Sequence, residues 1–169
     1  MAVKQILTEP NEILRQISKP VESVSKEDQV LMDDMLETMY AANGIGLAAI
    51  QIGIAKRIIV MDLSRDNEKK EPRYFVNPVI QNKDSEKSTY EEGCLSVPNQ
   101  FAEIDRPSSC VVEYLDYDGK KQILNADGLL ATCIQHEMDH LEGILFIDYL
   151  SKLKKSMILK KLSKKKSNQ

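Results

Sequence analysis

The only two histidines of this chain lie four positions apart, and a glutamate follows the first of them. The segment reads His136-Glu137-Met138-Asp139-His140. Residues i and i+4 share one face of a helix, so both imidazoles can reach one metal ion while Glu137 lies beside them. The alternative is a solvated helix that carries two histidines by chance. The spacing favours a catalytic metal site.

A catalytic metal site typically needs a third protein ligand and keeps one position for water. The chain has no third histidine, so the third ligand is a carboxylate or a thiolate. Cys110 begins an apolar strand, and Cys133 lies three residues before His136 on a register suited to core packing. Cys94 follows Gly93 at the end of an expected strand and can present its sulfur to a neighbouring helix. We therefore prefer Cys94 to the other two cysteines.

The composition is that of an ordinary globular protein, with 42% hydrophobic and 29% charged residues in 169. This length is typical of one domain. No apolar run reaches membrane-spanning length and the first residues do not resemble a signal peptide, so we expect a cytoplasmic protein. Three cysteines, an odd number, argue against a disulfide framework.

Charge is distributed unevenly along the chain. Residues 151–169 contain eight lysines and no acid, and the preceding 150 residues carry a net charge of −11. The basic end predicts a polyanionic partner. An equal alternative is that Lys164-Lys165-Lys166 only solubilise a frayed terminus. The apolar stripe of this end could also pack on its own domain; it comprises Leu150, Leu153, Met157, Ile158 and Leu162.

Helical patterns flank the middle of the chain. Apolar residues at helical spacing between Leu31 and Met39 predict a helix that a Ser25/Asp28 capping box begins and Asn43-Gly44 ends. Its methionines are interpreted as core residues. A short helical segment is expected at 10–14. Asp127 is expected to cap the histidine-bearing helix, from about Gly128 to Leu141, and Gly143 to end it.

The middle of the chain is rich in strand patterns, which together with the helices indicate the α+β class. We expect antiparallel or mixed β-sheets packed around a central metal-binding HExxH helix, with an N-terminal and a C-terminal helix. The expected strands are Arg57–Met61, Tyr74–Val76 ended by Asn77-Pro78, and a hairpin of Cys110–Leu115 and Lys121–Leu124 turning at Asp118-Gly119.

Three separate motifs resemble those of the peptide deformylase family in order and in spacing. They are Gly44-Ile45-Gly46-Leu47-Ala48-Ala49-Ile50-Gln51, Glu92-Gly93-Cys94-Leu95-Ser96, and Gln135-His136-Glu137-Met138-Asp139-His140. The resemblance extends from the N-terminal helix to about Leu150. It implies a metal-dependent hydrolase that removes the formyl group from the N-terminal formyl-methionine of nascent polypeptides.

The resemblance also implies roles for individual residues. Cys94, His136 and His140 are the implied metal ligands, and Glu137 is the implied catalytic acid and base. The Gln51 amide and the Leu95 backbone N–H are the implied donors to the oxyanion. The implied substrate-binding residues are Gly44, Ile45, Gly46, Glu92, Gly93 and Leu129, with Arg106 near the rim of the methionine pocket. Thr132 stands where a larger aliphatic residue is expected, which predicts a more polar or wider pocket wall.

The expected cofactor is one divalent metal ion. Two imidazoles and a thiolate suit zinc on ligand type alone. The resemblance points instead to Fe²⁺ in the cell, with Ni²⁺ or Co²⁺ as working substitutes and Zn²⁺ as a poor one.

Two alternative functions remain open from the residues. A zincin-type metallopeptidase also uses HExxH, but its third ligand lies further along the chain, where only the acids Glu142 and Asp148 are present. The other alternative is an inactive deformylase-like metal-binding protein.

We expect residues 1–150 to form a single metallohydrolase domain and 151–169 a basic amphipathic C-terminal helix with a frayed tail. The resemblance implies N-formylmethionyl nascent peptides as partners and, through the basic helix, the ribosome. We expect no membrane association and a monomer.

Overall fold

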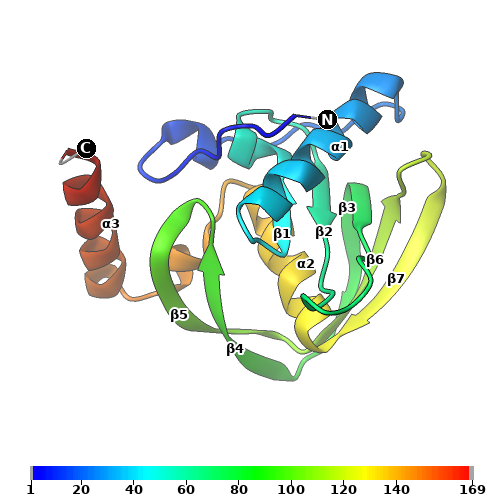
Figure 1. Ribbon diagram of the computed structural model, residues 1–169. Helices are drawn as coiled ribbons and strands as arrows, with labels where there is room; N and C mark the ends of the chain where they lie inside the picture. The colour runs from blue at the N-terminus through cyan, green and yellow to red at the C-terminus, as the bar shows by residue number, and fades with distance from the viewer. Residues whose placement is uncertain (1, 168–169) are drawn as a thin grey trace.

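The computed structural model describes residues 2–167, with side chains described up to residue 164. Within this part the chain is α+β, with three α-helices, a five-stranded antiparallel sheet and a separate two-stranded antiparallel sheet (Figure 1). This confirms the predicted class. None of the described helices combines the length and apolar character that crossing a membrane requires.

The elements follow a simple order along the chain. The larger sheet has the order β1 (Gly46–Ala48), β2 (Ile58–Met61), β3 (Arg73–Lys83), β6 (Ser109–Leu115) and β7 (Lys121–Asp127). The smaller sheet pairs β4 (Lys87–Cys94) with β5 (Val97–Pro107). The helices are α1 (Lys26–Ala41), α2 (Gly128–His140) and α3 (Lys152–Ser167). Short 3-10 turns are η1 (Glu12–Arg15), η2 (Ala49–Ile52) and η3 (Phe146–Tyr149).

Strand β2 lies inside the larger sheet, and both of its faces are buried. Ile59 and Met61 pack in the cluster that includes α2, whereas Ile58 and Val60 pack in the cluster that includes α1. A strand with alternate residues in two cores has no polar face, which explains its continuous apolar sequence. The sheet is therefore held between α1 and α2 (Figure 1).

Helix α1 forms as its sequence predicts. The Ser25 Oγ accepts a hydrogen bond from the Asp28 N–H at 3.2 Å, and Asp28 Oδ2 accepts one from the Ser25 N–H at 3.1 Å. This capping box satisfies two backbone groups that a helix start would leave unpaired. The helix ends before Asn43, whose φ is 57°. Met32, Met35 and Met39 are fully buried, which confirms their core assignment.

The prediction that Asn77-Pro78 ends a strand is wrong, because β3 continues to Lys83. The pairing of β3 with β6 shifts between Val76 and Val79, so a bulge accommodates the proline, which has no N–H to donate. Asn77, at φ 51°, stabilises the bulge by bonding both backbone groups of Val21 through its side-chain amide, at 2.8 and 2.7 Å.

The predicted hairpin is confirmed as β6 paired with β7, and helix α2 begins directly after it. Asp127 occupies the N-cap position, but its side chain makes no capping hydrogen bond, so that detail of the prediction is wrong. The helix ends at His140, and Gly143 follows at φ 73°. Helix α2 contacts β1, β6 and β7 of the larger sheet and β4 and β5 of the smaller one. Helix α2 therefore lies between the two sheets (Figure 1).

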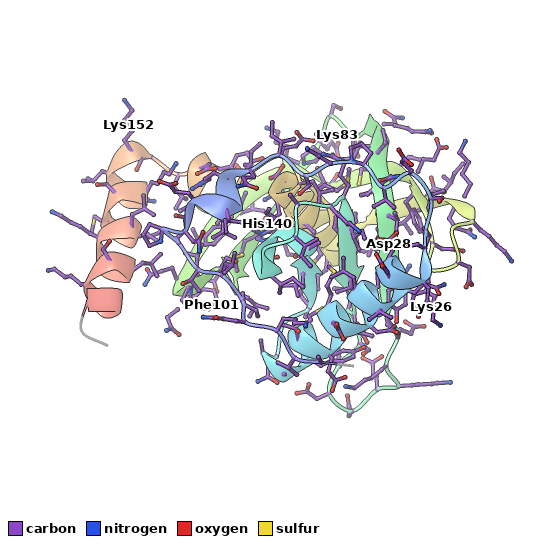
Figure 2. All side chains as sticks on the ribbon, turned by 90° about the horizontal axis from the view of Figure 1, so that it is seen from above. Lys26, Asp28, Lys83, Phe101, His140 and Lys152 are labelled. Atoms are coloured by element: carbon purple, nitrogen blue, oxygen red, sulfur yellow. The ribbon has the colours of Figure 1, made fainter. Side chains whose placement is uncertain are left out.

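Helix α3 packs on the body through only part of its apolar stripe. Ile158 and Leu162 are buried in the cluster of Val97 and Phe146, whereas Leu153 and Met157 are 71% and 52% exposed. Figure 2 shows the neighbouring Lys152 pointing away from the body. The expected frayed tail includes 168–169, which lie outside the described residues.

Candidate metal centre and active-site cavity

The side chains of Cys94, His136 and His140 converge. One potential ligand atom from each residue lies within 4.8 Å of the other two. The Sγ of Cys94 is 3.4 Å from the Nε2 of His140, and the two imidazole centroids are 5.2 Å apart. His140 lies in the interior of the molecule (Figure 2). The structure thus brings together the three residues that the sequence singled out as metal ligands.

Cys94 reaches helix α2 because of its position at the end of strand β4. The pairing of β4 with β5 shifts after Gly93, and Cys94 pairs with Val97 across a tight turn. Successive strand side chains point to opposite faces, so Cys94 shares a face with Glu92. The same face therefore brings a sulfur and a carboxylate to the two histidines.

His136 is held through one ring nitrogen, which leaves the other for the centre. Its Nδ1 lies 2.9 Å from Oε1 of Glu92. A carboxylate in this position fixes the tautomer and the orientation of a metal-binding histidine. Burial lowers the pKa of His136, but hydrogen bonds with Cys94 and Glu92 outweigh burial and raise the pKa overall. Burial lowers the pKa of His140 and favours its neutral, metal-binding form.

Glu92 belongs to a buried ion-pair network with Arg106 and Asp139. Arg106 donates from Nε and Nη2 to the two Glu92 oxygens at 2.7 and 2.9 Å, and from Nη1 to Asp139 at 2.8 Å. The Tyr149 hydroxyl donates to the same Asp139 oxygen at 2.7 Å. Burial raises the pKa of Glu92, but its bonds to His136 and Arg106 outweigh burial, so the pKa lies below the usual value.

Arg106 is not at the rim of the methionine pocket, and this expectation is corrected. Its side chain is 5% exposed and is absent from the lining of the cavity described below. A guanidinium in this buried position needs carboxylate partners, and Glu92 and Asp139 supply them behind His136.

Glu137 lies beside the three converging side chains, and its carboxylate fills the space next to Gly46. A Cβ on Gly46 would overlap the Glu137 carboxylate. One carboxylate oxygen, Oε1, is buried and has no hydrogen-bond partner among the described residues. Burial raises the pKa of Glu137 to about 7. A carboxyl group with this pKa can take up and release a proton near neutral pH.

Gln51 is fixed at both ends of its amide. Its Oε1 accepts from the Ala48 N–H at 2.9 Å, and its Nε2 donates to the Ser96 hydroxyl at 3.0 Å. The same nitrogen lies 3.5 Å from the sulfur of Cys94. The η2 turn therefore presents one amide N–H toward the centre.

A cavity of about 460 Å³ opens beside these groups. The predicted site residues that line it are Gly44, Ile45, Gly46, Gln51, Glu92, Gly93, Cys94, Leu95, Leu129, His136 and Glu137. Ile45 and Leu129 are 44% and 46% exposed, so they form an apolar mouth. The sequence reasoning missed Phe101, which also lines the cavity, and Ser96 behind Gln51. The alternation of strand faces signals the position of Glu92, but no sequence signal marks Phe101.

The other two cysteines lie outside the converging group. Cys133 packs in the core between α2 and the larger sheet. Burial, with the nearby Glu137 and Glu92 charges, raises its pKa to about 12, so it remains a thiol. Cys110 is buried in the same core. Within the described residues, Cys94 is the cysteine placed to bind a metal with the histidines.

Comparisons with known proteins identify the relatives of this chain. The family model described as polypeptide deformylase matches residues 3–156. The chain is 80% identical to a peptide deformylase of Pelagibacter ubique (strain HTCC1062), over 99% of this chain and 98% of the relative. The chain belongs to the peptide deformylase family.

Solved structures of peptide deformylases share the fold. A crystal structure from Ehrlichia chaffeensis has a TM-score of 0.94 and 43% identity, with 99% of this chain and 98% of that chain covered. A second, from the same organism in complex with actinonin, has a TM-score of 0.93 and 45% identity, with 98% of each chain covered. Like its family, this chain is a metal-dependent hydrolase that removes the formyl group from peptides. Neither a zincin-type metallopeptidase nor an inactive deformylase-like protein is favoured.

Proposed function

We propose that this enzyme hydrolyses the N-formyl group from the N-terminal formyl-methionine of nascent polypeptides and releases formate. We further propose that Cys94, His136 and His140 hold the single divalent metal ion that the reaction needs, so that α2 is the central metal-binding helix. The observation that carries this assignment is the convergence of one sulfur and two imidazoles at the inner end of the cavity.

The donor set fits a divalent transition metal. A thiolate and two imidazoles are ligands for zinc and for the other late divalent metals, and three protein ligands leave a position open. We propose Fe²⁺ as the metal in the cell, with Ni²⁺, Co²⁺ or Zn²⁺ able to occupy the site in purified protein. When bound, such an ion lowers the pKa of water and polarises a carbonyl oxygen.

Glu137 is proposed to move the proton in this reaction. Its carboxylate accepts a proton from the attacking water and then delivers it to the amine nitrogen as the formyl C–N bond breaks. Two features support this role, namely the unpartnered buried Oε1 and the raised pKa. Gly46 keeps the carboxylate in place because it offers no side chain to displace it.

Gln51 and Leu95 are proposed to stabilise the oxyanion that forms on the formyl oxygen. The amide of Gln51 is already oriented by Ala48 and Ser96, so little reorganisation is needed when charge develops. The backbone N–H of Leu95 follows Cys94 in the turn that ends β4. One oriented donor of this kind is worth roughly 3–4 kcal/mol to the transition state.

The cavity mouth is proposed to bind the peptide. The segment Gly44–Gly46 offers its backbone for pairing with an extended peptide, as strands do at a sheet edge. Ile45, Gly93 and Leu129 line the space for the methionine side chain. Glu92 borders this space, but its carboxylate oxygens are bonded to His136 and Arg106. We therefore assign both Glu92 and Arg106 to the support of His136.

We propose that 1–150 form a single metallohydrolase domain, and that 151–169 are a basic helix and tail that dock on the ribosome. The exposed Leu153 and Met157 beside several lysines support an external partner for α3. Cytoplasmic ribosomes produce the proposed substrate, so we place the enzyme in the cytoplasm. One chain supplies all the residues of the centre, which supports action as a monomer.

The proposal is tested by formate release from N-formyl-Met-Ala-Ser. Glu137→Gln should lose at least 100-fold in kcat/KM and keep about one metal ion per chain, because the substitution removes the proton carrier and no ligand. Cys94→Ala should lose the metal itself. Glu142→Gln, a change of the same chemistry on an exposed residue, serves as the control. Full activity of Glu137→Gln, or a metal-replete and active Cys94→Ala, would contradict the proposal.

A further inference from the structure

One face of helix α2 forms a wall of the active-site cavity. Leu129, Thr132, Cys133, His136 and Glu137 follow the i, i+3, i+4 spacing of a single helical stripe, and all five line the cavity. Leu129 is 46% exposed, whereas Thr132 and Glu137, further along the stripe, are only 4% and 6% exposed. The wall therefore runs from the apolar mouth to the proposed proton carrier, with Thr132 between them.

The hydroxyl of Thr132 has no hydrogen-bond partner among the described residues. Its oxygen is also not completely enclosed by protein atoms, so it remains accessible from the cavity. A helical threonine commonly bonds the carbonyl four residues back, as Thr38 does to Asp34 at 2.7 Å. Thr132 makes no such bond and lines the cavity. Its hydroxyl is therefore available to a ligand.

The position of Thr132 matches the end of a methionine side chain. Thr132 precedes His136 by four residues and Glu137 by five, which is roughly 6 and 7.5 Å along the helix axis. In methionine, three bonds of about 1.5 Å separate the α-carbon from the sulfur, a span of roughly 4 Å. A first side chain that runs from the reacting centre along α2 toward the mouth thus brings its sulfur near Thr132.

We propose that Thr132 is a specificity-determining residue whose hydroxyl donates a hydrogen bond to the sulfur substituent of the first side chain. The enzyme then accepts N-formyl peptides that begin with methionine sulfoxide as well as those that begin with methionine. This inference rests on the proposed function and names a second substrate class for the same site.

The chemistry of the two side chains explains the expected preference. A thioether is a weak acceptor, whereas oxidation to the sulfoxide adds a polar, chiral S–O group. An aliphatic wall would leave that oxygen without a donor once water is excluded. Thr132 supplies a donor, and Cys133 beside it is a protonated thiol with a weak one. This part of the pocket can therefore solvate an oxidised methionine.

The test compares formate release from four N-formyl-X-Ala-Ser peptides, where X is methionine, each of the two epimers of methionine sulfoxide, or norleucine. Norleucine has the same length without a polar atom, so the ratio of sulfoxide to norleucine kcat/KM isolates the polar contact. Thr132→Val removes the hydroxyl and keeps the shape. We expect this ratio to fall about fivefold for at least one epimer, and Thr132→Ser, which keeps a hydroxyl, to retain most of it.

Thr89→Val is the matched control, because Thr89 lies on the exposed side of β4 and does not line the cavity. It should leave the ratio unchanged. A ratio that changes by less than twofold in Thr132→Val, or a wild-type enzyme that releases formate only from methionine and norleucine peptides, overturns the inference and leaves the proposed function intact. No formate release from any peptide would overturn both.

Discussion

The Nδ1 of His136 lies 2.9 Å from Oε1 of Glu92, and Arg106 holds both oxygens of that carboxylate. Strand β4 thus contributes twice to the centre. Cys94 supplies the sulfur, and Glu92, two residues earlier on the same face, orients the histidine that comes from α2. The centre depends on contact between the smaller sheet and the helix as well as on the ligands themselves.

Loss of the Glu92 carboxylate should weaken metal binding. Glu92→Gln keeps the shape of the side chain but removes the charge that orients and polarises His136. We expect metal affinity to fall about 10–100-fold, as found for similar outer partners of metal ligands. Competition with a chelator, followed by measurement of metal content, gives the affinity.

The control for this substitution is Glu103→Gln, an exposed residue of β5 in the same two-stranded sheet. It should retain wild-type affinity. Equal metal retention by Glu92→Gln and the wild type would show that the orientation of His136 does not depend on Glu92.

A side chain at position 46 should impair catalysis while sparing the metal. The added Cβ of Gly46→Ala would meet the Glu137 carboxylate, so the carboxylate must move. A displacement of about 1 Å at a catalytic group can cost roughly 100-fold in rate, and we expect a loss of that order in kcat/KM. Metal content measured on the same sample should remain near one per chain. Activity within threefold of wild type would show that catalysis does not require the space that Gly46 leaves for the Glu137 carboxylate.

Much of this site could be predicted from the sequence because its chemistry is local. The i, i+4 spacing of His136 and His140 places both rings on one helix face, and Gly93-Cys94 at a strand end marks a sulfur that can leave the sheet. The capping box of Ser25 and Asp28 is equally local.

The features that sequence reasoning missed depend on contacts between distant segments. The family resemblance placed Arg106 near the substrate, and no local pattern shows that Glu92 and Asp139 surround it instead. The continuation of β3 past Pro78 depends on Asn77 bonding Val21, 56 positions away. The exposure of Leu153 likewise follows from where α3 meets the body, which helical periodicity does not specify.

Acid should destabilise the protein partly through Asp28. Burial raises the pKa of Asp28, but hydrogen bonds from Lys56 and Ser25 outweigh burial and hold it below the usual value of 3.8. The folded state therefore favours the ionised form. Its contribution to the free energy of unfolding is fully present above the unfolded-state pKa and is lost as pH falls through the lower folded-state pKa.

Urea unfolding of Asp28→Asn tests this account. At pH 7 the variant should lose about 1 kcal/mol or more, since it removes the carboxylate charge that pairs with Lys56 at 2.9 Å and that strengthens the hydrogen bond from the Ser25 N–H. The difference from wild type should shrink below pH 3.8. Glu27→Gln, an exposed change in the same helical turn, should stay within about 0.5 kcal/mol. A difference that stays constant with pH would rule out the ionised carboxylate as its source.

Charge on α3 should govern ribosome binding if that helix docks there. Replacing Lys154, Lys160 and Lys161 with glutamine should weaken co-sedimentation with ribosomes and reduce the steepness of its salt dependence, because fewer counterions are released. The matched control replaces Lys26, Lys69 and Lys120, which lie elsewhere on the molecule. Equal loss in both triple variants would indicate general charge attraction and not a docking role for α3.

The ligand set of the metal centre can be measured directly by X-ray absorption at the edge of the bound metal, on enzyme prepared without oxygen. We expect one sulfur and two imidazole nitrogens around the ion, with the sulfur contribution lost in Cys94→Ser and retained in Cys133→Ser. A spectrum with nitrogen and oxygen neighbours alone, or a sulfur that persists in Cys94→Ser, would contradict it.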